Sequence, residues 1–169
     1  MPKAVQVRSR GTVERYAGAL ERLRTAGDYV VVFRGVLRAV AMSCPDGCGE
    51  VVTVNLDPRS GPAWRRYDAD SRLSLYPSVW RDTGCRAHFI VCRDRIHWCG
   101  EYLSSTTPID AKLTGAVLLI LDRRRPLHFE KIADAIGAIP WEVLWSCRDL
   151  VRAGLANEGK PGVFWRDGR

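Results

Sequence analysis

The chain has 169 residues, of which 46% are hydrophobic, and it carries a formal net charge of +7. This length suits one domain or two small ones, and the hydrophobic content excludes a chain that is disordered throughout. The positive charge would suit a nucleic-acid-binding protein, but the basic residues are spread along the chain apart from the run at 123–125. An even spread of charge favours a solvated surface.

The sequence also predicts where the protein works. The N-terminal residues have no apolar core of the length that a signal peptide needs, and the longest aliphatic run, 116–121, is too short to cross a bilayer. We therefore expect a cytoplasmic protein without a membrane span. In that reducing compartment, the six cysteines indicate metal binding or chemistry more often than disulfides.

The first half of the chain predicts a helix followed by strands. Apolar residues at helical spacing predict a helix over 12–26, which Gly27 ends. Runs of β-branched and aromatic residues bounded by turns predict strands at 29–33, 36–42, 51–56 and 72–76.

The segment 87–99 predicts a hairpin that turns at Arg93 and Asp94. Because positions 88 and 99 are symmetric about that turn, His88 should lie opposite Cys99. A slip of one residue in the pairing would remove this contact.

From about residue 113 the pattern becomes helical. The expected helices cover 113–125, 129–136 and 140–153, and the strands of a short hairpin follow at 155–157 and 163–166. Three helices followed by a hairpin are typical of a winged helix-turn-helix domain.

The third of these helices bears on the kind of partner. Its inward positions should be Leu144, Cys147, Leu150 and Val151, and its outer stripe Trp141, Trp145, Arg148 and Arg152. DNA binding needs several basic residues that neutralise phosphates, whereas tryptophan beside arginine is typical of a protein-binding hot spot. We rank packing of this face within the chain first, a protein partner second and nucleic acid third.

The cysteines suggest a zinc site. Cys44 and Cys48 flank a tight turn rich in glycine and proline, and Cys85, His88 and Cys99 are candidates for a second pair. Zinc takes four such ligands in a tetrahedron, usually from two close-spaced pairs. The alternative is a set of buried free cysteines, but these cysteines cluster at turns rather than on apolar faces.

The site is predicted to hold one structural zinc. Cys92 and Cys147 have apolar neighbours, and we expect both to be packing residues. Cys44, Cys48 and Cys85 are then joined by either Cys99 or His88. The predicted fold is α+β. An N-terminal helix and a zinc-stapled, β-rich domain occupy 1–110, and a winged helix-turn-helix domain occupies 111–169.

Four segments occur in a fixed order, CPDGCGE at 44–50, PSVW at 77–80, GCRAHF at 84–89 and WC at 98–99. Over roughly residues 30–100 they resemble a small bacterial domain of unknown function. That domain is encoded beside multiubiquitin-like proteins, ThiF-type activating enzymes and JAB-type peptidases in ubiquitin-like conjugation operons. Its members often carry cysteine at the position of Asp46 and serine at that of Ala87, so neither residue is expected to be essential here.

The resemblance implies a serine peptidase that processes or removes a ubiquitin-like protein at its C-terminus. Ser78 would be the nucleophile, His88 its general base and Glu50 the group that orients the imidazole. If His88 is free for chemistry, Cys99 becomes the fourth zinc ligand. The implied partners are the ubiquitin-like protein and its conjugation enzymes, and the substrate tail would lie extended along an exposed strand edge.

Simpler interpretations stand beside this one. A serine after a proline is usually a turn residue, a histidine three residues after a zinc cysteine is usually another ligand, and Glu50 beside a glycine turn is most often a solvated charge. The alternative function is therefore a non-enzymatic zinc-binding winged-helix module, either a DNA-binding regulator or an adaptor in the ubiquitin-like pathway.

Overall fold

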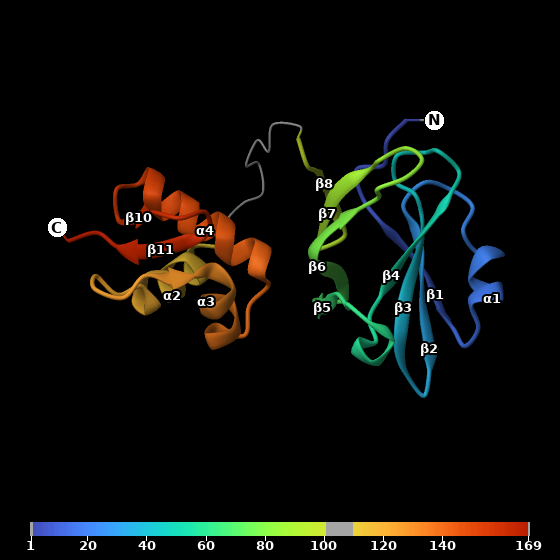
Figure 1. Ribbon diagram of the computed structural model, residues 1–169, viewed down its shortest axis with the longest axis horizontal. Coiled ribbons are helices and arrows are strands. Elements are labelled where there is room, and N and C mark those ends of the chain that lie inside the picture. Colours follow the sequence, from blue (N-terminus) through green and yellow to red (C-terminus); the bar gives the residue numbers. More distant parts are fainter. Residues whose placement is uncertain (1, 101–109, 169) are drawn as a thin grey trace. The chain divides into compact units, whose positions relative to one another are not determined.

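The computed structural model describes residues 2–100 and 110–168, which fall into two compact units, Met1–Leu103 and Ser104–Arg169 (Figure 1). The described part is mixed α+β, as predicted. The first unit contains β1 (Arg8–Val13), α1 (Tyr16–Leu20), β2 (Asp28–Arg34), β3 (Val36–Ser43), β4 (Val51–Asn55), the 3₁₀ helix η1 (Pro58–Ser60), β5 (Arg65–Ala69), β6 (Arg72–Trp80), β7 (His88–Cys92) and β8 (Arg95–Trp98).

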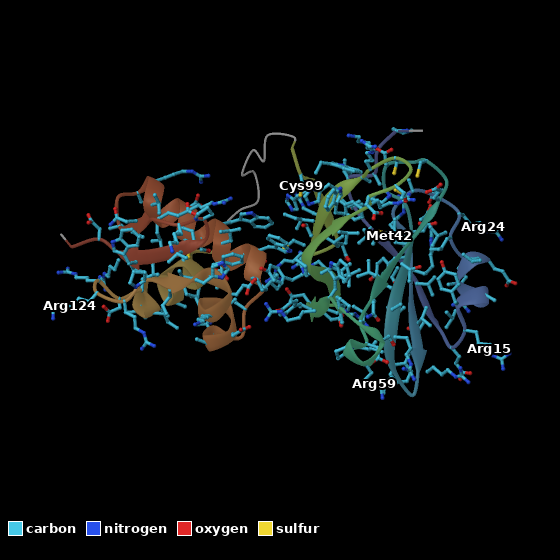
Figure 2. The ribbon with its side chains drawn as sticks, viewed as in Figure 1. Arg15, Arg24, Met42, Arg59, Cys99 and Arg124 are labelled. Atoms are coloured by element: carbon cyan, nitrogen blue, oxygen red, sulfur yellow. The ribbon has the colours of Figure 1, made fainter. Side chains whose placement is uncertain are left out.

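The first unit is built from two four-stranded sheets, with the orders β1-β2-β3-β4 and β5-β6-β7-β8 (Figure 1). Its main core combines side chains from both sheets, because the inward positions of each strand alternate with outward ones. Fully buried members of this core are Val40, Met42, Leu73, Leu75, Phe89 and Val91 (Figure 2 labels Met42). A smaller cluster is formed by Ala19 of α1 with Val30 and Ala41 of the first sheet.

The predicted helix over 12–26 is wrong in extent and partly in kind. Residues 8–13 form β1, which pairs in parallel with β2, and only Tyr16–Leu20 is helical. The buried carboxylate of Asp28 explains the preference for a strand, because it binds the guanidinium groups of Arg8 and Arg10 at 3.2 and 3.0 Å. This tertiary anchor outweighs the helical spacing of the apolar residues.

The predicted strands are otherwise confirmed, with two additions. β6 continues to Trp80, and β5, which was not predicted, pairs with its first half. The hairpin register is confirmed as well, since Phe89 pairs with Trp98 and the Cys99 N–H donates to the His88 carbonyl at 2.9 Å.

The second unit contains α2 (Ala111–Ile120), β9 (Leu127–His128), α3 (Phe129–Ile136), α4 (Pro140–Arg152), β10 (Ala156–Glu158) and β11 (Val163–Arg166). Its sheet has the order β10-β11-β9. α2 ends near Leu121 rather than at Arg125, because the following turn is closed by Asp122, whose carboxylate accepts from the Arg124 N–H. The short strand β9 then lies before α3, and it was not predicted.

The predicted inward face of α4 is confirmed at Leu144, Cys147 and Leu150, which are buried. Trp141 is also buried, so its ring is not part of an outer stripe, while Arg148 and Arg152 are exposed. Within 2–100 and 110–168, each helix is too short or too polar to cross a bilayer.

Candidate active site and cysteine cluster

Ser78 lies on β6 where the ladder with β7 is irregular. Leu75 pairs with Val91 and Val79 with Phe89, so four steps along β6 match two steps along β7. A bulge of this kind bends a strand and redirects its side chains, and bulges are frequent beside active sites. The half-buried side chain of Ser78 lies within this bulge.

His88 is the first residue of β7, and its imidazole reaches Ser78. The two groups are 3.0 Å apart, measured from His88 Nε2 to Ser78 Oγ. The hydroxyl donates to Nε2 when the neutral ring carries its proton on Nδ1. Because serine becomes a good nucleophile only when a base removes its proton, this contact is the geometry that nucleophilic catalysis needs.

Trp80 lies on the same face of the sheet as this pair. Strand residues alternate between faces, and Val79 and Phe89 point into the core, so Ser78, Trp80 and His88 point to the other side. The ring centroids of Trp80 and His88 are 6.1 Å apart. Trp80 is nevertheless 68% exposed, which is unusual for a tryptophan.

Trp64 holds the backbone at the bulge. Its indole N–H donates to the Ser78 carbonyl at 3.2 Å, and its backbone N–H donates to Asn55 of β4 at 2.8 Å. Trp64 therefore connects the Ser78 bulge to the first sheet. The sequence offered no signal for this contact, because it depends on how the two sheets pack.

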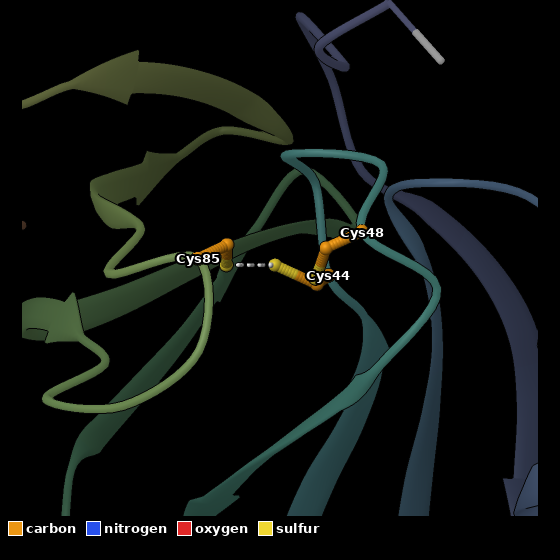
Figure 3. A group of neighbouring side chains, drawn as sticks. All are labelled: Cys44, Cys48 and Cys85. Carbon is orange, nitrogen blue, oxygen red and sulfur yellow. Dashed lines mark hydrogen bonds between the residues drawn. The ribbon is translucent and has the colours of Figure 1, made fainter.

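Three of the predicted metal ligands lie together. Cys44 follows β3, Cys48 lies in the next turn and Cys85 lies between β6 and β7 (Figure 3). Their sulfur atoms are all within 4.8 Å of one another, and the Cys44 and Cys85 sulfurs are 3.6 Å apart. Gly47 provides the positive φ of 82° that lets the chain turn back between the first two cysteines.

The thiols of the cluster differ in acidity. Burial raises the pKa of Cys44 to about 12. The pKa of Cys48 is lowered, chiefly because its sulfur accepts from the Glu50 backbone N–H. The cluster therefore favours a thiolate at Cys48 before Cys44 loses its proton, and a bound metal ion would remove protons from all three cysteines.

Arg81 adds a positive charge to the cluster. Its Nη1 lies 3.5 Å from the sulfurs of both Cys48 and Cys85, and its Nη2 donates to the Glu50 carboxylate. The arginine side chain is only 14% exposed. It is therefore placed to balance negative charge on the thiolates, a contact that sequence reasoning missed.

The remaining predicted residues are placed differently. The Glu50 carboxylate hydrogen bonds Arg81, and no carboxylate among residues 2–100 and 110–168 hydrogen bonds the His88 ring. The physical reason is the charge on Arg81, which attracts Glu50 to the cysteine cluster. Cys99 contacts His88 through its backbone, but its sulfur is not part of the three-cysteine group, so its role as fourth ligand stays a prediction.

The two other cysteines that we expected to pack, Cys92 and Cys147, are both buried. Burial also raises the pKa of Cys147 to about 12, which keeps this thiol protonated and unreactive at neutral pH.

Residues 15–99 match the protein family described as "Bacterial ubiquitination-like system serine protease (BubE)". The chain belongs to this family. The BubE match takes in the Ser78–His88 pair and the cysteine cluster, and it ends before the Ser104–Arg169 unit. No curated protein and no solved structure gives a significant match. As a BubE family member, the protein is a serine protease of a bacterial ubiquitination-like system.

Proposed function

We propose that this protein is a serine peptidase that cleaves the chain at the C-terminus of a ubiquitin-like protein, and so processes a precursor or releases a conjugate. One observation carries the proposal, the 3.0 Å contact between Ser78 Oγ and His88 Nε2. Membership of a serine protease family supports a hydrolytic role for such a pair. The ubiquitin-like substrate is inferred from the kind of system to which the family belongs.

In this mechanism His88 Nε2 takes the Ser78 proton while the oxygen attacks the scissile carbonyl. Collapse of the tetrahedral intermediate breaks the C–N bond, and the imidazolium returns the proton to the leaving amine. Water then attacks the acyl-enzyme and gives a proton to the same nitrogen, and this proton passes to Ser78 Oγ as the ester C–O bond breaks. The products are the free carboxyl end of the ubiquitin-like protein and the amine.

Glu50 has a different part in the proposal from the one the sequence implied. Its carboxylate is paired with Arg81, whose guanidinium lies against Cys48 and Cys85. We assign Glu50 to positioning that arginine at the cysteine cluster. The minimal catalytic unit is then the dyad of Ser78 and His88.

The metal proposal concerns a structural zinc ion held by Cys44, Cys48 and Cys85. Tetrahedral zinc–thiolate bonds of about 2.3 Å require sulfur atoms about 3.8 Å apart, and the Cys44–Cys85 separation of 3.6 Å fits this requirement. A bound zinc would supply cross-links between the turn after β3 and the loop before β7. The fourth position is assigned to Cys99, since His88 Nε2 is engaged with Ser78.

The Ser104–Arg169 unit is proposed to be a winged helix-turn-helix domain, in which packing of the α4 face within the chain ranks before a protein partner and nucleic acid ranks third. The order of its elements, three helices with a hairpin after the last, supports this fold. Nucleic-acid binding is less well supported, because Arg152 of α4 is already paired with Asp149. A non-enzymatic winged-helix adaptor remains the rival function.

The test uses the ubiquitin-like protein of the same system with a short C-terminal extension. We expect the wild-type protein to remove the extension, and Ser78→Ala and His88→Gln to lose the activity while their zinc content is unchanged. Ser60→Ala is the matched control, since Ser60 is an exposed serine of the same unit. Wild-type protein that leaves the extension intact, or Ser78→Ala that still cleaves it, would overturn the proposal.

A further inference from the structure

Among the described residues of the first unit, no strand pairs with the end of β6 on the side away from β7. β5 covers β6 only as far as the pair Arg65↔Tyr76. At Trp64 the chain turns to the other sheet, where its N–H donates to Asn55. The end of β6, including Trp80, therefore continues beyond its β5 neighbour.

The register shows which way the Trp80 backbone points. In an antiparallel ladder, hydrogen-bonded pairs alternate with pairs that are not hydrogen bonded. Arg81 N–H donates to the Ala87 carbonyl, and the His88 carbonyl accepts from Cys99 of the neighbouring hairpin strand. The Trp80↔His88 pair between them is thus the non-hydrogen-bonded kind. The backbone N–H and C=O of Trp80 therefore point away from β7, toward the open edge.

The Trp80 side chain adds an apolar surface at the same place. It is 68% exposed and stands beside the His88 ring at 6.1 Å. Trp80 follows Ser78 by two residues, and two residues of a strand span about 7 Å. An extended chain bound to the Trp80 N–H and C=O would therefore reach Ser78 within one or two residues. An unpaired strand edge with an exposed aromatic residue is a template for adding another strand.

Other edges of the unit are less suitable. The outer edge of β8 is covered by the N-terminal segment, since Val7 N–H donates to Asp94 and Ile96 N–H to Val5. Ser78 itself is blocked on the open side, because its carbonyl already accepts from the Trp64 indole. Among the described residues, Trp80 therefore offers the open backbone pair that lies nearest to the Ser78–His88 dyad.

We propose that the extended C-terminal tail of the ubiquitin-like substrate binds as an added strand at this edge, through backbone hydrogen bonds to the Trp80 N–H and C=O and packing against its indole. The inference rests on the proposed function and names the binding site for that substrate. The tail is the fitting occupant because cleavage requires its backbone to pass Ser78, and an extended backbone matches a strand edge without needing a particular side chain.

The experiment uses synthetic peptides that cover the tail and the cleaved bond, each with a single N-methyl group at a successive position. Methylation removes the one amide that donates to Trp80 C=O, so we expect kcat/KM to fall about tenfold at that position, and little at either neighbour, whose N–H points away. Trp80→Ala should raise KM for the unmethylated peptide, and Trp80→Phe should restore most of the affinity.

A second readout separates the two proposals. A fluorophosphonate probe reacts with an activated serine without needing a tail, so labelling of Ser78 in the wild-type protein reports on the dyad separately from tail binding. Cleavage that is equally fast for every methylated peptide and for Trp80→Ala would overturn the edge-binding site while leaving the peptidase intact. Wild-type protein that neither labels nor cleaves would overturn the proposed function, and the edge-binding site with it.

Discussion

Trp64→Phe tests whether the hydrogen bond from the Trp64 indole holds Ser78 in its catalytic position. Phenylalanine keeps most of the ring that packs against the core but removes the indole N–H that donates to the Ser78 carbonyl at 3.2 Å. One such hydrogen bond contributes about 1 kcal/mol, so we expect a free energy of unfolding lower by about that amount. The protein should therefore remain folded at room temperature.

The effect on catalysis should be larger than the effect on stability. Without its anchor the bulge is free to shift, and a displacement of about 1 Å between nucleophile and base can cost about a hundredfold in rate. We expect kcat for Trp64→Phe to fall about 10- to 100-fold with KM almost unchanged, because the Trp80 edge is untouched. The assay is steady-state cleavage of the extended ubiquitin-like protein, with urea unfolding measured in parallel.

Trp98→Phe is the matched control. Trp98 packs against the same core, with its ring 5.7 Å from that of Phe89, and it makes no hydrogen bond to Ser78. It should keep its kcat, because the smaller ring weakens the core without freeing the backbone at Ser78. Equal losses of kcat in the two variants would refute the reasoning, since they would show a general effect of a weakened core rather than control of Ser78.

Three further predictions follow from other contacts. The hydrogen bonds from Arg10, Thr25 and Arg24 outweigh burial and hold the pKa of Asp28 below its ordinary value, so its stabilising effect is present above about pH 4 and is lost as the pH falls. In urea titrations between pH 6 and 3, the wild type should therefore lose unfolding free energy more steeply than Asp28→Asn. Elemental analysis should find one zinc per chain in the wild type and in Cys147→Ser but none in Cys44→Ser, and chelation should lower the Tm of the wild type. Glu50→Gln should keep most of its kcat, whereas His88→Gln should lose about 100-fold or more, and equal losses would restore Glu50 to the catalytic unit.

The hairpin and the helices of the second unit could be predicted because their signals are local. Alternation around a two-residue turn sets the β7–β8 register, and this is why His88 was correctly placed opposite Cys99. α3 has the predicted bounds because Gly137 adopts the left-handed conformation that ends it. Each of these elements depends on residues close to it in the sequence.

Contacts between distant segments could not be predicted in the same way. The strand β1 was missed, and its last two residues were included in the predicted helix over 12–26. Its pairing depends on Asp28, whose ion pairs with Arg8 and Arg10 form only when the sheet is assembled. The bulge at Ser78 and its anchor, Trp64, depend on the packing of two sheets. The clustering of cysteines at turns was visible in the sequence, but the arginine that lies among them was not.

The central claim is that Ser78 is a nucleophile activated by His88, and chemical labelling tests it most directly. The protein is incubated with a fluorophosphonate probe and the modified peptide is identified by mass spectrometry. A single adduct on Ser78, absent from His88→Gln and unchanged in Ser60→Ala, is the predicted result. Cleavage of the substrate by a protein whose Ser78 stays unlabelled, or labelling of Ser78 at full rate in His88→Gln, would contradict the account.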